Sequence, residues 1–174
     1  MIFKLEKVYL GLDIEKIKHL LLNPSFWEDV VENTKKISIT KTSPTKLHQE
    51  MVMEVEIDSL GLIKRDVETI QDVVFNPEEP YFDEVGSFKT QIIKVKVENS
   101  NQLRYFDGII KIDEKPGKAR IIFTLDKIGL KDSLVELLGI QLTIRRMRRE
   151  LKRIMEKVAV YQKEGILEKF YKNS

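Results

Sequence analysis

The feature that most constrains this chain is a long amphipathic helix near its C-terminus, preceded by a run of strand-like segments. Between Leu137 and Tyr161 the apolar residues recur at steps of three or four, within a helix predicted over residues 133–164. Six strand-like runs come before it, separated by turn residues. A helix with one apolar seam needs a second layer to bury that seam. We therefore expect an antiparallel sheet that curves around the helix.

The N-terminal segment predicts one further strand and two short helices. Residues 2–12 are rich in strand-forming side chains. Asp13 is a candidate N-cap, and apolar residues then recur at helical spacing as far as residue 22. Asn23-Pro24 ends this helix and starts a second one over residues 24–32, with Phe26 and Trp27 on its apolar face. The expected fold class is α+β.

Length and composition favour one domain without disulfides. The 174 residues, 42% of them hydrophobic, are enough for a single core, which we place over residues 1–165 with a tail over residues 166–174. The absence of cysteine excludes disulfides and thiolate metal sites. Together with 33% charged residues, it also matches the usage of thermophile proteins.

Charge and hydropathy indicate a cytoplasmic protein for which no nucleic-acid partner is expected. The formal net charge of +2 is too small to attract a polyanion to the whole molecule. The N-terminus lacks the apolar segment of a signal peptide, and no apolar run is long enough to span a membrane. The sequence does not predict the oligomeric state.

The sequence lacks the common motifs of catalytic, metal and nucleotide-cofactor sites. His19 and His48 are the only histidines, and neither lies at the spacing of a known metal motif. No G-x-S-x-G, G-x-G-x-x-G or P-loop pattern is present. We therefore expect no catalytic triad, no metal and no cofactor, and we expect both histidines to lie at the solvated surface.

The order of elements and the N-terminal helices resemble the START-like, or helix-grip, superfamily. The resemblance rests on LDIEKI at residues 12–17, on LNPSFW at residues 22–27, and on the strands and long helix that follow. The superfamily, also called SRPBCC, includes lipid-transfer, birch-pollen-allergen and polyketide cyclase-like proteins, and the resemblance covers about residues 1–164. It implies a seven-stranded curved antiparallel sheet that grips the last helix, with a hydrophobic cavity between them. It does not imply one activity.

Alternation along the strands predicts which residues would line such a cavity. One strand presents methionines and a valine on a single face, the last strand adds Phe123, and the helix seam faces them. We expect these walls to bind, or transport, a lipid-like or polycyclic hydrophobic molecule. The predicted ligand-binding residues are Met51, Met53, Val55, Arg65, Thr69, Tyr105, Phe123, Ile140, Ile144 and Met147.

Three alternatives stay open. Arg65 either meets an anionic ligand group, Tyr105 or Asp107, or lies at a sheet end in water. The same three residues would be the candidate polar groups of a cyclase- or aromatase-like enzyme. The last helix is rich in arginine and lysine over residues 145–157. This pattern favours either a solvated outer face or a surface for a partner, such as a transient contact with an anionic membrane.

Overall fold

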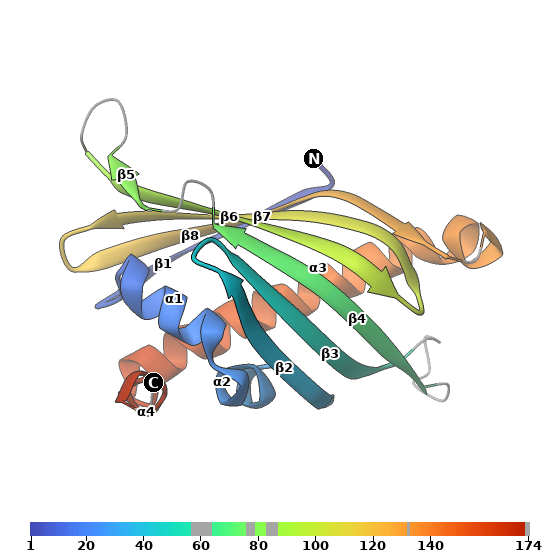
Figure 1. Ribbon diagram of the computed structural model, residues 1–174, viewed down its shortest axis with the longest axis horizontal. Helices are drawn as coiled ribbons and strands as arrows, with labels where there is room; N and C mark the ends of the chain where they lie inside the picture. The colour runs from blue at the N-terminus through green and yellow to red at the C-terminus, as the bar shows by residue number, and fades with distance from the viewer. Residues whose placement is uncertain (57–63, 76–78, 83–86, 132, 173–174) are drawn as a thin grey trace.

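The computed structural model describes residues 1–56, 64–75, 79–82, 87–131 and 133–172 (Figure 1). Its helices and strands in chain order are β1 (Phe3–Leu10), α1 (Ile14–Leu22), α2 (Pro24–Val30), β2 (Thr34–Ser43), β3 (Lys46–Glu56), β4 (Lys64–Phe75), β5 (Tyr81–Phe82), β6 (Lys89–Ser100), β7 (Leu103–Lys115), β8 (Lys118–Leu130), α3 (Ser133–Lys163) and α4 (Glu168–Lys172). The side chains of residues 56 and 133–138, including the predicted seam residue Leu137, lie outside the described part. So does most of the loop predicted over residues 76–87.

One antiparallel sheet runs through the molecule and curves around α3 (Figure 1). Its strand order is β1-β8-β7-β6-β4-β3-β2, so most neighbours in the chain are also neighbours in the sheet. These features confirm the predicted α+β fold with a curved antiparallel sheet and a long C-terminal helix. The strand count differs slightly, because β5 pairs with β6 and gives eight strands among the described residues. A two-residue strand is too short for alternation to reveal it.

Helix α1 begins at its predicted N-cap, and α2 begins at Pro24 with Asn23 as its N-cap. Asp13 accepts a hydrogen bond from the backbone N–H of Lys16 at 2.8 Å. The Asn23 side chain accepts one from the backbone N–H of Ser25 at 2.9 Å. Helix α2 ends at Val30, earlier than predicted, because Val31 is already in an extended conformation.

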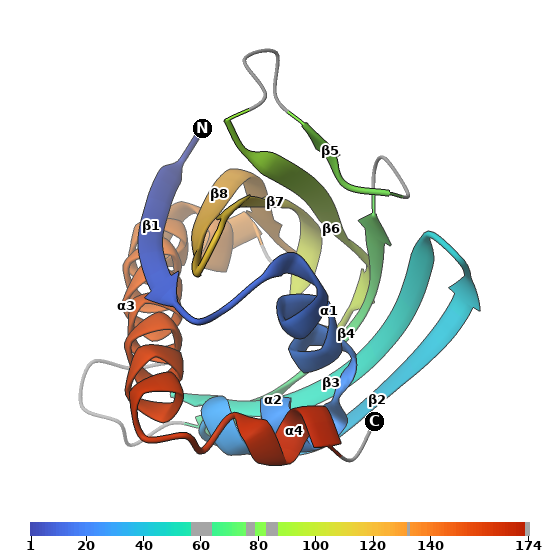
Figure 2. The same ribbon diagram turned by 90° about the vertical axis from the view of Figure 1, so that its left-hand side faces the viewer.

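The larger of two buried cores closes one end of the curved sheet, where α1, α2 and α4 lie together (Figure 2). Ile17 of α1, Ile93 of β6 and Val158 of α3 are among its buried residues. Leu167 and Phe170 are buried in the same core, so the chain packs against it beyond residue 165. Val158 is the one buried residue in the part of α3 whose side chains are described.

A smaller core lies between the first half of α3 and strands β1, β7 and β8. Its buried residues are Phe3, Phe123, Leu125 and Ile128. Ile144, Met147 and Leu151 of α3 pack against this core but stay partly exposed. The apolar seam of α3 is therefore covered less completely in its first half than around Val158.

Polar contacts fix the second half of α3 to the rest of the fold. The Tyr9 hydroxyl donates to the Met155 carbonyl at 2.9 Å, and its burial raises the pKa of the phenol. The Lys157 ammonium donates to the Asp29 carbonyl of α2 at 2.6 Å.

Within the described residues, no helix is long and apolar enough to cross a membrane.

Candidate functional site

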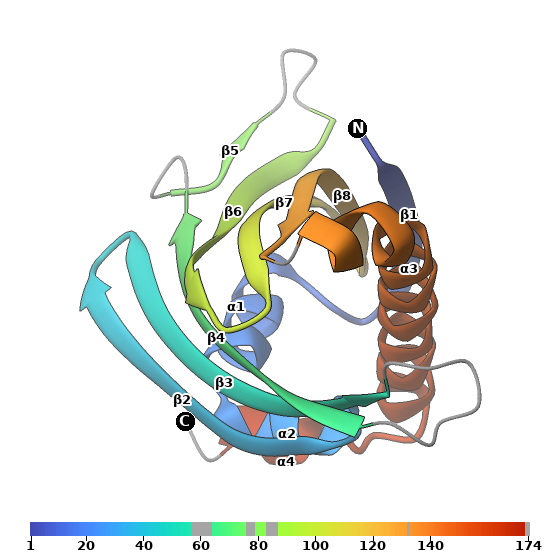
Figure 3. The ribbon, with the colours of Figure 1, turned by 90° about the vertical axis from the view of Figure 1, so that its right-hand side faces the viewer.

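The face of β3 and β4 that looks toward α3 is apolar but only partly buried (Figure 3). Met51, Met53 and Val55 share this face on β3, and Val67 continues it on β4; we call these four residues the concave surface. All four keep intermediate exposure, whereas Leu47 at the other end of β3 is buried. Apolar side chains left in this state lack a complete packing partner within the described residues.

The apolar residues in the first half of α3 are also only partly buried. Ile140, Ile144 and Met147 pack against the smaller core, and each keeps intermediate exposure. The main backbone neighbours of α3 are β1, β8 and α2 rather than β3 or β4. The apolar residues of α3 and those of the concave surface are thus both left partly exposed.

Four polar residues interrupt the apolar face of β3 and β4. Nε2 of Gln71 donates a hydrogen bond to Oε1 of Gln49, which lies opposite it on β3. Gln49 is 4% exposed and Thr69 is 8% exposed, so the polar groups of both lie under other side chains. Arg65 is exposed near the start of β4, opposite Val55, and forms no ion pair with the described residues. The polar groups therefore run from the buried middle of β4 to its exposed end.

The structure brings most of the predicted ligand-binding residues onto these two surfaces. Phe123 is buried beneath α3 in the smaller core, next to Ile140, Ile144 and Met147. Tyr105 lies outside these two surfaces. Phe106 packs against the smaller core, so alternation along β7 places both Tyr105 and Asp107 on the convex side of the sheet.

The position of Gly129 agrees with this placement of Tyr105. A Cβ atom added at Gly129 would lie 2.5 Å from the Tyr105 ring, which shows that the ring covers this glycine. Tyr105 is 44% exposed there.

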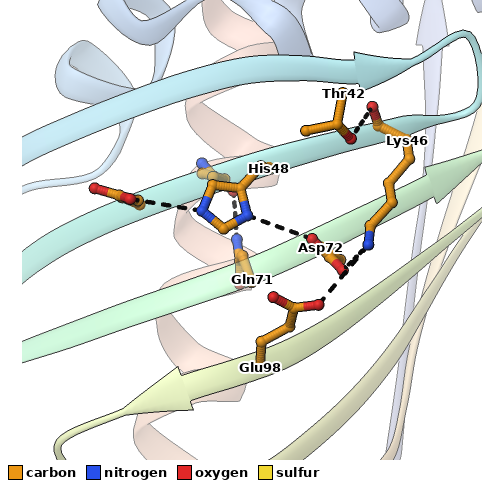
Figure 4. Close-up of polar contacts among 8 residues, drawn as sticks. Thr42, Lys46, His48, Gln71, Asp72 and Glu98 are labelled. Atoms are coloured by element: carbon orange, nitrogen blue, oxygen red, sulfur yellow. Dashed lines mark hydrogen bonds and ion pairs between the residues drawn. The ribbon is translucent and has the colours of Figure 1, made fainter.

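A second cluster of polar residues lies on the convex side of β3, β4 and β6 (Figure 4). We call Lys46, His48, Asp72 and Glu98 the His48 cluster. Nδ1 of His48 lies 3.5 Å from Oδ1 of Asp72, and the Lys46 ammonium forms ion pairs with Asp72 and, at 3.8 Å, with Glu98. On the other side of the imidazole ring, Nε2 lies 3.5 Å from Oε1 of Glu50.

The carboxyl groups of the His48 cluster perturb one another. Burial alone would raise the pKa of Asp72, but contacts with Glu98, Lys46 and His48 outweigh it and hold this pKa below its usual range. The Asp72 carboxylate in turn raises the pKa of Glu98. The same carboxylate raises the pKa of the Lys46 ammonium through their hydrogen bond.

The sequence motifs for metal sites did not reveal the His48 cluster, because such motifs lie within one segment and these residues come from three strands. His48 and Asp72 lie directly opposite each other in the β3–β4 pair. Aligning the two predicted strands residue by residue would therefore have predicted that these side chains lie close together. The position of Glu98 does not follow from strand pairing alone. A β-bulge between Ile70 and Gln71 in the pairing of β4 with β6 leaves Glu98 opposite no residue of β4, and only the structure shows it beside Asp72.

Two surface pockets lie away from the His48 cluster and from the polar residues on the inner face of β3 and β4. One has a volume of about 310 Å³ and is lined by Lys16, Gln162, Gly165, Glu168, Tyr171 and Lys172. The other has a volume of about 540 Å³ and is lined by Asn23, Ser25, Glu28, Asp29, Lys169 and Phe170. The surface of the second pocket is mostly polar, so an apolar ligand would gain little burial there, whereas the surface of the first pocket is mostly apolar.

No protein-family model and no curated protein sequence matches this chain. Solved structures do resemble it. A protein from Thermus thermophilus superposes with a TM-score of 0.65 at 10% identity, over 93% of this chain and 97% of that one. A STAR-related lipid transfer protein from Xanthomonas axonopodis has a TM-score of 0.56 at 10% identity, over 87% of this chain and 81% of that one.

A di-domain ARO/CYC protein from the steffimycin biosynthetic pathway has a TM-score of 0.56 at 12% identity, over 94% of this chain and 52% of that one. Identities this low show the fold rather than the activity. The curved antiparallel sheet, the helix lying against it and these three likenesses agree with one another. The chain therefore has the START-like helix-grip fold.

Proposed function

We propose that the protein binds a hydrophobic molecule with one polar or anionic end, between the concave surface and the first half of α3. The observation that carries this proposal is the partial exposure of the apolar residues on both of these elements. The likeness in fold to a STAR-related lipid transfer protein supports it. Burial of a ligand there would recover about 25 cal/mol for each Å² of apolar surface removed from water.

The polar residues of β4 suggest how the ligand is oriented. Arg65 lies at the exposed end of the strand, where a carboxylate or phosphate could reach it without carrying its charge into the core. The apolar part of the ligand would extend past Val55 and Met53 toward α3. Met51 and Met53 suit ligands of irregular shape because their side chains are flexible and polarizable.

The test is a titration of a long-chain fatty acid and of a neutral polycyclic fluorescent probe into three proteins. The wild-type protein should bind both saturably. Arg65→Met should weaken fatty-acid binding by about tenfold, the effect of losing one charge-assisted contact, and should leave the neutral probe unaffected. Lys94→Met removes an exposed positive charge from β6 and serves as the matched control. Absence of saturable binding to the wild type would reject the proposal, and equal fatty-acid affinity in all three proteins would remove Arg65 from it.

A cyclase- or aromatase-like activity is the alternative, suggested by the likeness in fold to the di-domain ARO/CYC protein. Such chemistry needs acid–base groups that face the ligand. On β3 and β4 the polar residues of the inner face are two amides, one hydroxyl and one guanidinium, and Tyr105 and Asp107 face outward on β7. This arrangement favours binding over catalysis.

We further propose a transient contact between α3 and an anionic membrane surface. Arg145, Arg148 and Arg149 are exposed on successive turns and form no ion pair with the described residues. Arg153, in contrast, is paired with Glu150 and Glu32. Unpaired arginines on one helix face complement the charge of anionic lipid headgroups.

Sedimentation with lipid vesicles tests the membrane contact. The wild type should bind vesicles that contain phosphatidylserine and should not bind vesicles of phosphatidylcholine alone. A double substitution of Arg145 and Arg149 by glutamine should reduce this binding, whereas the control, with Lys94 and Lys96 of β6 replaced by glutamine, should keep it. Equal loss in the two variants would show that net charge, rather than the α3 surface, determines binding.

A further inference from the structure

The His48 cluster combines donor groups that transition metals prefer, on a part of the sheet that the proposed hydrophobic ligand does not touch. We propose that His48, Asp72 and Glu98 bind a divalent transition-metal ion such as Zn²⁺. One ligand atom from each residue lies within 4.8 Å of the other two. One imidazole nitrogen and two carboxylate oxygens, completed by water, form a donor set that suits zinc.

The geometry requires a contraction of the site that side-chain rotation can supply. In a tetrahedral zinc site with bonds of about 2.0–2.1 Å, neighbouring ligand atoms lie about 3.3 Å apart. Nδ1 of His48 and Oδ1 of Asp72 are already 3.5 Å apart. The remaining adjustment falls on Glu98, whose side chain is 49% exposed and therefore has room to rotate. No movement of the strands is needed, because the three ligands come from strands that are paired side by side.

Asp72 gives independent evidence for a ligand at this point. The residue is 7% exposed, and its shielded Oδ1 atom forms no regular hydrogen bond within the described residues, since Nδ1 of His48 lies 3.5 Å away from it. A shielded carboxylate oxygen without a hydrogen bond is unfavourable and calls for an explanation. Because this oxygen faces the His48 ring, a metal ion between the two would satisfy both groups.

Glu50 strengthens the case from the other side of the ring. Its Oε1 atom lies 3.5 Å from Nε2 of His48, which is the nitrogen that would not bind the metal. Metal-binding histidines commonly direct their second nitrogen at a carboxylate, which fixes the orientation and the tautomer of the ring. His48 therefore has a carboxylate on the ligand side and another on the orienting side.

Lys46 is the natural competitor for the site. Its ammonium group pairs with Asp72 and Glu98 and so occupies the position of a cation. With Glu50 included, three carboxylates surround one imidazole and one ammonium, so the group keeps an excess of negative charge. The Lys46 side chain is 42% exposed and can swing into solvent when a divalent ion binds. We therefore expect Lys46 to weaken metal binding without preventing it.

Calorimetric titration of Zn²⁺ into the full chain tests this proposal. The wild type should bind one ion, and His48→Gln and Glu98→Gln should each weaken binding by at least about tenfold. Lys46→Met should bind more tightly than the wild type. His19→Gln is the matched control, because it removes the other histidine of the chain and should leave the affinity unchanged. Both ligand substitutions are at partly or fully exposed positions, and circular dichroism will confirm that the variants fold.

A second readout reports the ligands directly. Co²⁺ bound by a nitrogen and two oxygens in a four-coordinate site should absorb visible light, and His48→Gln should abolish this absorption. Equal Zn²⁺ affinity of the wild type and His48→Gln would overturn the proposal. So would the absence of saturable binding in the wild type. Binding seen in Lys46→Met alone would show that the lysine keeps the site closed in the natural protein, which also overturns it. None of these outcomes depends on hydrophobic-ligand binding.

Discussion

The same substitution at two helical isoleucines should have very different effects on stability if the concave surface is open. Ile17 lies in α1, is 3% exposed and belongs to the larger core. Ile144 lies in α3, packs against the smaller core and keeps intermediate exposure. Changing each isoleucine to alanine removes the same three carbons and gives the same gain in helix propensity. The difference between the two variants therefore reports the packing around each side chain.

The expected magnitudes follow from transfer and cavity terms. Three buried carbons contribute about 2.4 kcal/mol, at about 0.8 kcal/mol each. At Ile17 the enclosed space left behind adds about 1.5–2 kcal/mol, at about 24 cal/mol per Å³, so Ile17→Ala should lower the free energy of unfolding by about 4 kcal/mol. At Ile144 part of the side chain already contacts solvent and no enclosed cavity forms, so the loss should be about 1–2 kcal/mol.

Guanidinium denaturation, followed by far-UV circular dichroism and by the fluorescence of Trp27, measures both losses in one experiment. Ligand titration of the same variants completes it, because Ile144→Ala should weaken probe binding and Ile17→Ala should not. Losses of equal size would mean that α3 and the sheet pack closed at Ile144. The proposal of a hydrophobic ligand would then lose the observation that carries it.

Three further substitutions test how the fold is held together. Tyr9→Phe removes the hydrogen bond to the Met155 carbonyl and should lower the free energy of unfolding by about 1 kcal/mol, measured by denaturation. Asp113→Asn should lower it by about 1.5–3 kcal/mol at pH 7, because the buried carboxylate accepts from Arg120 at 2.8 Å and from Thr90 at 2.9 Å. Burial raises the pKa of Asp113, but these contacts and Lys111 bring it below the unfolded value, so the stabilisation is complete above about pH 4 and is lost as the pH falls through the folded pKa. The denaturation curves of wild type and Asp113→Asn should therefore converge in acid. Gly117→Ala should lower stability by about 1 kcal/mol through backbone strain alone, since φ is +78° and no atom lies near the added Cβ.

The sequence predicted the fold well because the signals that define it are local. The cap at Asp13, the break at Asn23-Pro24 and the seam of α3 each involve residues within a few positions of one another. Alternation also predicted an apolar face on β3, and Leu47, which shares the strand face of Met51, is buried. The same rule, applied along β7 from Phe106, would have placed Tyr105 on the convex side. The cytoplasmic location and the thermophile origin stay predictions.

The His48 cluster shows where local signals stop. Its four residues come from three strands, and each looks like an ordinary surface charge when read along its own strand. Their proximity depends on the β3–β4 register and on the bulge that places Glu98 next to Asp72. Asp72 is buried as a consequence, although its strand position predicts solvent. Buried polar groups on the outer side of a sheet are therefore a feature that only pairing information reveals.

The distribution of packing in this molecule separates the residues that hold the fold from those proposed to bind a ligand. The buried contacts of α1, α2, α4 and the second half of α3 lie at one end, and Tyr9 and Lys157 fix the helix there. An apolar surface left partly open is unfavourable in water, and a small fold can keep one only if its stability comes from elsewhere. Because the closed end supplies that stability, the first half of α3 need not pack tightly on β3 and β4. The unfilled contacts are then available as binding energy for an apolar ligand, which would complete the packing that the sheet and the helix leave unfinished.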